Sequence, residues 1–400
     1  MHVLTLNVSL RSVAIALGRR IAFFTLLATR FAASPVSALP SQPIVVPMSA
    51  DSFVIPAPNA GSATAGPQFV EFLGRKAVYL PSGLIGVKGS KMRDGTIDVD
   101  VATKPGSLFA GIAFREESEA NLEMIYLRPF ATDTIEAMQY TPRLNGDAIW
   151  QLLNSNHEKA SAHFSKDQWF HVKLVISGRT CAVFMNDSRD PTMTVTNLRR
   201  GDSEGAIGLW GLGGGAYFSN LSYMPSPDRA PPADLPPFEE AGIVTNWELS
   251  PAFDAAEIDA ATYPASMAQW DKVRAEEPGF VLVNRYRTSP AMFPMPSRED
   301  MRKCRVKGAM VVFARAHIAS TNAADKILKI GYSDEIVVYM NGKPIFSGKN
   351  ALSYRNDDAL GVFGLNDQAS IHLNAGDNDL LVAVTEYNGG WAFECKVSPN

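Results

Sequence analysis

Apolar and polar residues alternate along much of the first half of the chain, as they do in strands with one buried face. Thr96–Ala102 is the clearest case, because every second residue is apolar. Trp169–Ile176 and Thr180–Met185 are two more such runs, and the turn Ser177–Arg179 between them predicts a hairpin. Helical periodicity is almost absent, so the pattern predicts an all-β domain of many short strands, either a sandwich or a barrel.

Three strand-like runs follow one another in the stretch 122–153: Leu122–Leu127, Ile135–Tyr140 and Ile149–Leu153. Prolines and an Asn-Gly pair separate them, as expected for turns. The stretch is rich in large side chains with polar tips, namely Tyr126, Arg128, Gln139, Tyr140, Arg143, Trp150 and Gln151. Such side chains can stack on a sugar ring and bind its hydroxyl groups, and they can equally cap a sheet edge.

Strand alternation predicts which of these side chains point together. Met124, Tyr126 and Arg128 share one side of their strand, while Ile125 and Leu127 fill the core. We therefore expect a ligand-binding site on the first domain, formed by Arg115, Glu123, Tyr126, Arg128, Gln139 and Trp150. The alternative is that Arg128 pairs with a loop acid and that Trp150 belongs to the core.

Composition shifts divide the chain into five segments. We predict a signal peptide over 1–38, a Pro/Ala/Ser-rich tether over 39–67, a β-sandwich over 68–224, a Pro-rich linker over 225–237 and a second β-sandwich over 238–400. In the second sandwich Asn341-Gly342 is the strongest hairpin signal of the chain, and Ala265–Glu276 could form a short helix. The fold class is thus all-β, with two β-sandwich domains joined by a linker.

The N-terminus has the pattern of an export signal. Arg19-Arg20 precede the apolar run Ile21–Ala28, and Val36-Ser37-Ala38 is a small-residue cleavage pattern, so the mature chain should begin at Leu39 and contain no membrane span. The alternative is a wrongly assigned start or a retained anchor. The formal charge of −4 argues against nucleic acid and anionic membranes as partners.

The sequence lacks the common catalytic and metal-binding patterns. It contains no G-x-S-x-G, no H-E-x-x-H and no C-x-x-C, so we expect no catalytic residue, no transition-metal site and no cofactor. Its acidic residues are scattered, so the sequence neither predicts nor excludes a calcium site. Asp98 and Asp100 lie on one face of a strand, as a pair of catalytic carboxyl groups would, but outward-facing polar residues are normal there.

Two stretches resemble known families. The run W-F-H-V-K-L-V-I-S-G-R, with A-V-F-M-N-D, G-A-I-G-L-W and A-Y-F-S-N-L after it, resembles concanavalin-A-like jelly rolls of the laminin-G and 3-keto-disaccharide-hydrolase type. The run I-G-Y-S-D-E-I-V-V-Y-M-N-G-K-P-I-F-S-G resembles galactose-binding-like jelly rolls, which accompany secreted glycosidases. The resemblance implies sandwich folds that host lectins, hydrolases and adhesion modules alike. The laminarinase-type string E-x-D-x-E of the first fold is missing.

Jelly-roll topology also bears on the three cysteines. Cys304 and Cys395 lie near the first and last strands of the second sandwich, which are often neighbours, so they could form a disulfide in an oxidising compartment. Two buried thiols far apart are an equal alternative, and Cys181 has no obvious partner.

The leading hypothesis is an exported, periplasmic or extracellular, non-catalytic protein that binds a glycan or a small sugar. The first alternative is a glycoside-processing enzyme of the 3-keto-disaccharide-hydrolase type, with its site on the first domain. The second is a surface adhesion or assembly module with a protein partner.

Overall fold

The structure is a computed structural model that describes residues 42–56, 66–227, 238–258, 260, 269–289 and 296–398. The expected signal peptide and most of the expected linker lie outside these ranges. No helix among the described residues has the length and apolar character needed to cross a membrane.

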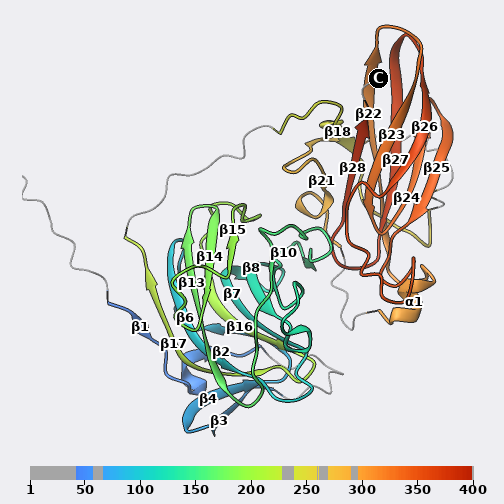
Figure 1. The fold of residues 1–400 in the computed structure, drawn as a ribbon. Helices are drawn as coiled ribbons and strands as arrows, with labels where there is room; N and C mark the ends of the chain where they lie inside the picture. Colours follow the sequence, from blue (N-terminus) through green and yellow to red (C-terminus); the bar gives the residue numbers. More distant parts are fainter. Residues whose placement is uncertain are drawn as a thin grey trace, which may run out of the picture. The chain divides into compact units, whose positions relative to one another are not determined.

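The first sandwich contains two antiparallel sheets. Within the described residues, its first sheet has eight strands: β15 (Met193–Val195), β14 (Thr180–Met185), β13 (Trp169–Ser177), β6 (Gly95–Ala102), β17 (Ala216–Pro225), β4 (Arg75–Leu80) and β3 (Gln68–Phe72) in that order, with β1 (Ile44–Val45) paired to β17. Figure 1 shows β6, β13 and β14 side by side in this sheet.

The second sheet of this sandwich carries most of the residues expected at the site. Among the described residues its nine strands are β11 (Asp147–Ala148), β10 (Arg143–Leu144), β8 (Asn121–Leu127), β7 (Phe109–Ser118), β16 (Ala206–Leu212), β5 (Gly83–Val87) and β2 (Phe53–Val54) in that order, with β9 (Met138–Tyr140) beside β8 and β12 (Lys159–Ala160) beside β9. The 3-10 turns η1 (Ala50–Ser52) and η2 (Pro129–Ala131) lie in its connections.

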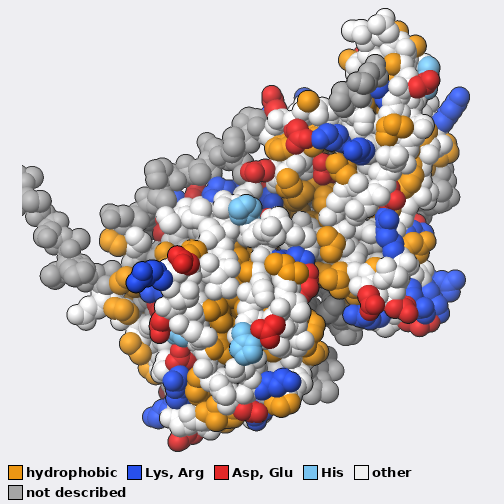
Figure 2. Space-filling view, in the orientation of Figure 1, with side chains coloured by type: hydrophobic (Ala, Val, Ile, Leu, Met, Phe, Trp, Pro, Cys, Tyr) orange, Lys and Arg blue, Asp and Glu red, His pale blue; other side chains and the backbone are white. Residues whose placement is uncertain are grey.

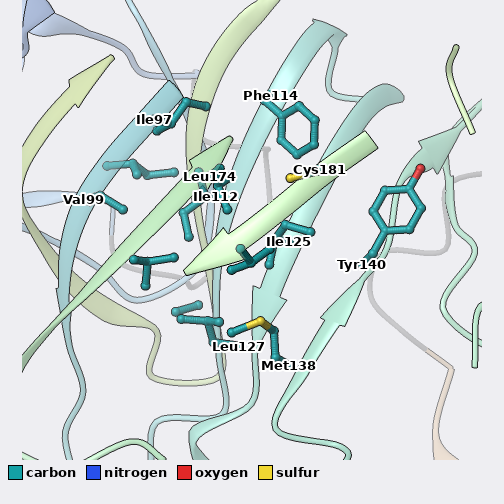
Figure 3. Packing of buried hydrophobic residues seen from close by; sticks show 14 of the residues in the cluster. Ile97, Val99, Ile112, Phe114, Ile125, Leu127, Met138, Tyr140, Leu174 and Cys181 are labelled. Atoms are coloured by element: carbon teal, nitrogen blue, oxygen red, sulfur yellow. The ribbon is translucent and has the colours of Figure 1, made fainter. Parts of the chain in front are cut away.

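The predicted alternation places the core between these two sheets. Ile97 and Val99 of β6 point inward and meet Ile112 of β7 and Ile125 of β8, as Figure 3 shows. All four side chains are at most 1% exposed. Burial of such apolar side chains is the main favourable term in the stability of a sandwich.

The second sandwich pairs a larger sheet with a smaller one. Within the described residues the larger sheet is β20 (Asp271–Arg274), β18 (Asn246–Leu249), β22 (Met310–Ser320), β27 (Gly376–Glu386), β24 (Glu335–Met340) and β25 (Lys343–Lys349) in that order, with β19 (Phe253–Asp254) beside β22. The smaller sheet is β21 (Val281–Leu282), β28 (Ala392–Val397), β23 (Ala324–Ser333) and β26 (Asp367–Leu373). The turn η3 (Val283–Arg285) and the helix α1 (Arg298–Arg302) complete it.

Both predicted hairpins form. β13 pairs with β14 from Val172–Met185 to Ser177–Thr180, which leaves two residues for the turn. Asn341 and Gly342 join β24 to β25 with φ of 50° and 76°. Positive φ at both central residues matches the twist of the flanking strands, and Asn and Gly adopt it most readily.

Three segments differ from the sequence-based expectations. The expected tether contains β1 and β2, which pair with β17 and β5. The expected strand Ile149–Leu153 is a turn segment. Part of the expected helix Ala265–Glu276 is the strand β20, and residues 261–268 lie outside the described ranges.

The three cysteines are free thiols, so the bridge between Cys304 and Cys395 does not form. Cys395 is buried in the core of the second sandwich. Cys304 packs instead against Ala309, Ala351 and Tyr387 in a separate small cluster, because it precedes β22 in an irregular segment and is not part of a strand.

The turn segment 149–153 joins the two sandwiches. The backbone N–H of Gln151 donates to Gly389 O at 2.9 Å, its side-chain Nε2 donates to Leu360 O at 2.8 Å, and its carbonyl accepts from Phe363 N at 2.9 Å. Gln151 is fully buried. Three residues of the second sandwich, Phe280, Leu282 and Ala392, also belong to the apolar cluster of the first sandwich.

Candidate functional site

The outer face of the second sheet gathers Tyr126 and its neighbours. Strand register places Tyr126 of β8 opposite Gly111 of β7 on one side and opposite Gln139 of β9 on the other. Trp210 of β16 is the next residue across, opposite Gly111. Gly111 has no side chain, so the rings of Tyr126 and Trp210 approach one another over it, with centroids 6.3 Å apart.

Tyr126, Arg128 and Gln139 form one hydrogen-bonded group. The Tyr126 hydroxyl donates to Gln139 Oε1 at 2.7 Å, and Arg128 Nη2 donates to both of these oxygens. The Arg128 guanidinium also lies 4.8 Å from the centroid of the Tyr126 ring. Burial raises the pKa of the Tyr126 hydroxyl, which therefore remains a neutral donor. These three side chains are thus in direct contact, although only Tyr126 and Arg128 of them line the cavity described below.

Further contacts hold this group in place. Gln139 Nε2 donates to Trp150 O at 2.8 Å and to Leu153 O. Arg128 Nη1 donates to Glu136 Oε2 at 2.6 Å, and Lys159 pairs with the other oxygen of the same carboxylate. Arg128 thus pairs with a loop acid, as the alternative interpretation expected, and it still lines the site.

Aromatic rings form a wall next to this group. Phe109 packs edge-on against Tyr126 with centroids 5.9 Å apart, and against Phe130 at 5.5 Å. Trp210 and Phe109 are 6.1 Å apart. Phe130 lies at the rim and is 58% exposed. Aromatic faces of this kind bind the apolar C–H face of a ring or any apolar group.

These side chains line a cavity of about 600 Å³. Its remaining lining includes Thr141, Arg143, Asp147 and Trp150 from the first sandwich, and Met301, Leu352 and Asn388 from the second. A volume of this size matches typical small-molecule pockets, which combine mostly apolar walls with a few oriented polar groups. Trp150 is half-buried and packs against the outer apolar cluster of Leu84, Met124 and Tyr126.

Two oxygen atoms of residues in the lining stand out because they lack a partner within the described part of the protein. Thr141 Oγ1 and Asn388 Oδ1 are buried and make no hydrogen bond among the described residues. Thr141 is only 2% exposed, and its backbone N–H is already bonded to Met124 O. A buried oxygen without a partner is costly. Both atoms expose almost no surface, so a ligand hydroxyl pairs with them only if a neighbouring side chain moves slightly, and that pairing removes the cost.

The two carboxyl groups of the lining are engaged by the protein. Glu136 pairs with Arg128 and Lys159. Asp147 accepts from Asn284 Nδ2 at 3.3 Å and contacts the Glu386 carboxyl, and burial raises its pKa. Burial also lowers the pKa of Arg143, whose Nη1 lies 3.4 Å from Glu119 Oε1.

Arg115 and Glu123 were expected at the site but lie elsewhere. Arg115 lies in the second half of β7, and its fully buried side chain donates to Arg93 O and Gly178 O and pairs with Asp94. Glu123 points into the core and accepts from the Tyr140 hydroxyl at 2.6 Å. Burial raises the pKa of Glu123. The two side chains hold loops together and do not line the cavity.

Strand alternation places Glu123 and Tyr126 on opposite faces of β8, so the sequence pattern alone excludes Glu123 from a site that contains Tyr126. Phe109, Thr141 and Trp210 of the lining were missed. Strand pairing, which the sequence does not reveal, brings them beside Tyr126.

The Asp98–Asp100 pair forms an ion cluster on the opposite sheet. His171 contacts both carboxylates, at 3.2 Å and 2.8 Å, and Arg75 and Lys173 add further charge. These partners match the interpretation as outward-facing polar residues. Among the described residues there is no group of three or more His, Cys, Asp or Glu side chains placed to hold a metal ion.

No family model matches the chain, and no curated protein matches it. Several solved structures are similar to parts of it. They include a carbohydrate-binding module, CBM66, from Bacillus subtilis, with 15% identity and a TM-score of 0.33 over 43% of this chain and 95% of the module. A galectin from Caenorhabditis elegans has 11% identity and a TM-score of 0.27 over 36% of this chain and 89% of the galectin.

Domain 4 of an extracellular arabinanase from Geobacillus stearothermophilus, solved with arabinotriose, has 11% identity and a TM-score of 0.28, over 44% of this chain and 82% of that domain. Identities and TM-scores this low indicate nothing about a ligand of this chain. Its function is therefore inferred from the residues of the cavity alone.

Proposed function

We propose that this is an exported, non-catalytic protein that binds a carbohydrate in the cavity on the outer face of β7, β8 and β16. The observation that carries the proposal is the pair of unpartnered buried oxygens, Thr141 Oγ1 and Asn388 Oδ1, in a cavity with an aromatic wall. The N-terminal sequence pattern supports export.

The chemistry of a sugar matches this combination. A pyranose presents hydroxyl groups that donate and accept hydrogen bonds, and an apolar C–H face that packs on aromatic rings. Thr141 and Asn388 supply the polar partners, and Phe109, Trp210 and Phe130 supply the rings. Tyr126 and Arg128 of the lining are held in place by their hydrogen bonds to Gln139, so little order is lost on binding.

Engaged carboxyl groups favour binding over hydrolysis. Glycoside hydrolysis needs one carboxyl group to donate a proton and another to act as base or nucleophile. Glu136 pairs with Arg128 and Lys159, and Asp147 is bonded to Asn284 and Glu386. Both carboxyl groups of the lining thus already have partners in the protein.

Thr141→Val tests the site directly. The substitution removes a hydroxyl that has no protein partner, so the melting temperature should stay the same or rise. Glycan affinity should fall about tenfold, the effect of one lost hydrogen bond of about 1.4 kcal/mol. Thr194→Val on β15, in the opposite sheet, is the matched control and should change neither quantity.

A glycan array and a hydrolysis screen with the same purified protein separate the alternatives. Binding without turnover, lost in Thr141→Val and kept in Thr194→Val, supports the proposal. Turnover that disappears in Asp147→Asn would replace it with the enzyme alternative. Intact-mass measurement of the exported protein tests the export part, since the expected chain begins at Leu39.

A further inference from the structure

The cavity has two ends of different chemistry. Thr141 lies beside Met124, whose carbonyl accepts from its N–H, while Phe109 lies at the level of Arg128. Four residues of β8 separate these two levels, which is roughly 13 Å at about 3.3 Å per residue. Thr141 therefore occupies one end and the exposed rim aromatic Phe130, which packs on Phe109, the other.

The aromatic end has more apolar surface than the face of one sugar can cover. Phe109 packs against Phe130 and lies opposite Leu212 there. Arg128, which lies at the same level, is already paired with Glu136. Phe130 leaves 58% of its surface in solvent although it packs edge-on against Phe109. Exposed apolar surface that continues into a cavity is a mark of ligand binding.

We propose that the ligand is a glycoside with an apolar aglycone, an alkyl or aryl group, rather than a free polar oligosaccharide. The sugar pairs with Thr141 and Asn388, and the aglycone covers Phe109, Phe130 and Leu212. This inference rests on the proposed function, because it places the sugar at the same two oxygens.

Flexible side chains adapt the middle of the cavity to such a ligand. Met124 and Met301, both at most 2% exposed, lie in the lining contributed by the two sandwiches. Thioether side chains repack around ligands of different shape, so they would accommodate aglycones of more than one kind. Thr141 and Asn388, in contrast, are fixed at the backbone: the N–H of Thr141 donates to Met124 O, and the N–H of Asn388 donates to the Asp334 carboxylate.

Isothermal titration calorimetry with a homologous series tests the proposal. The probes are the methyl, butyl, hexyl and octyl β-glycosides of glucose, galactose, mannose, xylose and N-acetylglucosamine, each below its micellar concentration, with the phenyl glycosides and 1-hexanol alongside. For the accepted sugar, affinity should rise about two- to fourfold per methylene until the aromatic end is filled. Equal affinity for the methyl, hexyl and phenyl glycosides would overturn the inference and leave carbohydrate binding intact.

Phe130→Ser is the variant that isolates the aromatic end. Because Phe130 is largely exposed, the variant should keep the wild-type melting temperature but lose most of the gain per methylene. Leu73→Ser, at an exposed apolar residue in the turn between β3 and β4, is the matched control and should leave the series unchanged. A series that is equally steep in Phe130→Ser contradicts the placement of the aglycone.

Binding of 1-hexanol separates the contribution of the sugar from that of the aglycone. If 1-hexanol binds as tightly as every hexyl glycoside, the sugar contributes nothing and the proposed function itself fails. If the hexyl glycoside binds more tightly than 1-hexanol and Thr141→Val removes the difference, both the sugar position and the aglycone position are supported. Silence of the whole panel contradicts both.

Discussion

The His171 imidazole lies between two carboxylates on the outer face of β6 and β13. Its Nε2 is 3.2 Å from Asp98 and its Nδ1 is 2.8 Å from Asp100. The hydrogen bond to Asp98 is the main cause that raises the His171 pKa to about 9. Burial alone would raise the Asp98 pKa, but His171 and Lys173 together lower it. At neutral pH this cluster therefore contains an imidazolium.

This contact predicts a pH dependence at the residue scale. The folded-state pKa lies above the ordinary value of 6.5, so the stabilisation is complete below about pH 6.5 and is lost as the pH rises through about 9. An NMR titration of the His171 ring should give a pKa near 9 in the folded protein. In Asp98→Asn the value should fall towards 6.5, and a wild-type value near 6.5 would contradict the geometry.

Strand alternation in the sequence predicts some of the site residues and misplaces others. Alternation along β8 correctly grouped Tyr126 with Arg128. Arg115 was misplaced because φ of 49° and a register shift in β7 turn its side chain away from the sheet. A bulge of this kind breaks the alternation on which the prediction rested, and nothing in the residue types marks it.

At the scale of elements, strand ends carry buried acids. Asp334 lies between β23 and β24, and its carboxylate accepts from Tyr387 N at 2.7 Å and from Asn388 N at 3.0 Å. Its other oxygen makes no hydrogen bond among the described residues. Burial raises the Asp334 pKa to about 8, and it also raises the pKa values of Asp147 and Glu386 nearby. The three carboxyl groups lie where the two sandwiches meet, and their raised pKa values favour the protonated, neutral form of each.

Asp334→Asn should make stability less dependent on pH. The ordinary pKa is 3.8 and the folded value is higher, so the wild type is favoured below about pH 4 and loses stability as the pH rises through about 8. Asparagine stays neutral and keeps an acceptor for the two N–H groups. Melting curves from pH 5 to 9 should therefore be flatter for the variant, and the variant should be the more stable protein at pH 9. Parallel curves would show that Asp334 does not titrate in this range.

Elements whose pattern is local were predicted well, and those that depend on distant partners were not. β6, β13, β14 and the β24–β25 hairpin follow from alternation and turn residues. Ile149–Leu153 has the apolar content of a strand, yet its apolar side chains and Gln151 are buried by the second sandwich, which the sequence cannot show. β20 likewise exists because β18 offers it a partner.

At the scale of the whole molecule, two glycines let the sandwiches approach. A Cβ on Gly390, whose φ is 120°, would lie 2.8 Å from Leu152 Cγ and 2.9 Å from Ile149 Cα. A Cβ on Gly389 would lie 2.3 Å from Gln151 Oε1. Both positions therefore favour glycine for backbone conformation and for space.

Gly390→Ala should destabilise both sandwiches together. The positive φ costs about 1–3 kcal/mol, and the clash with Leu152 and Ile149 adds about 1–3 kcal/mol. Gly376→Ala is the control, since Gly376 has φ of 95° but open space around its Cβ position, and it should show the first cost only. Calorimetry of the wild type should give one transition that shifts as a whole in Gly390→Ala. Two transitions, with only one of them shifted, would contradict a shared core.

Phe280, Leu282 and Ala392 of the second sandwich lie in the core of the first, and this affects how the two sandwiches can evolve. Modules joined by a linker can be exchanged by recombination, because each keeps its own core. Here a recombinant that replaced either sandwich would leave apolar side chains of the other without their partners. We therefore expect the two halves to be inherited together, and a substitution on one side of the junction to be followed by a compensating one on the other.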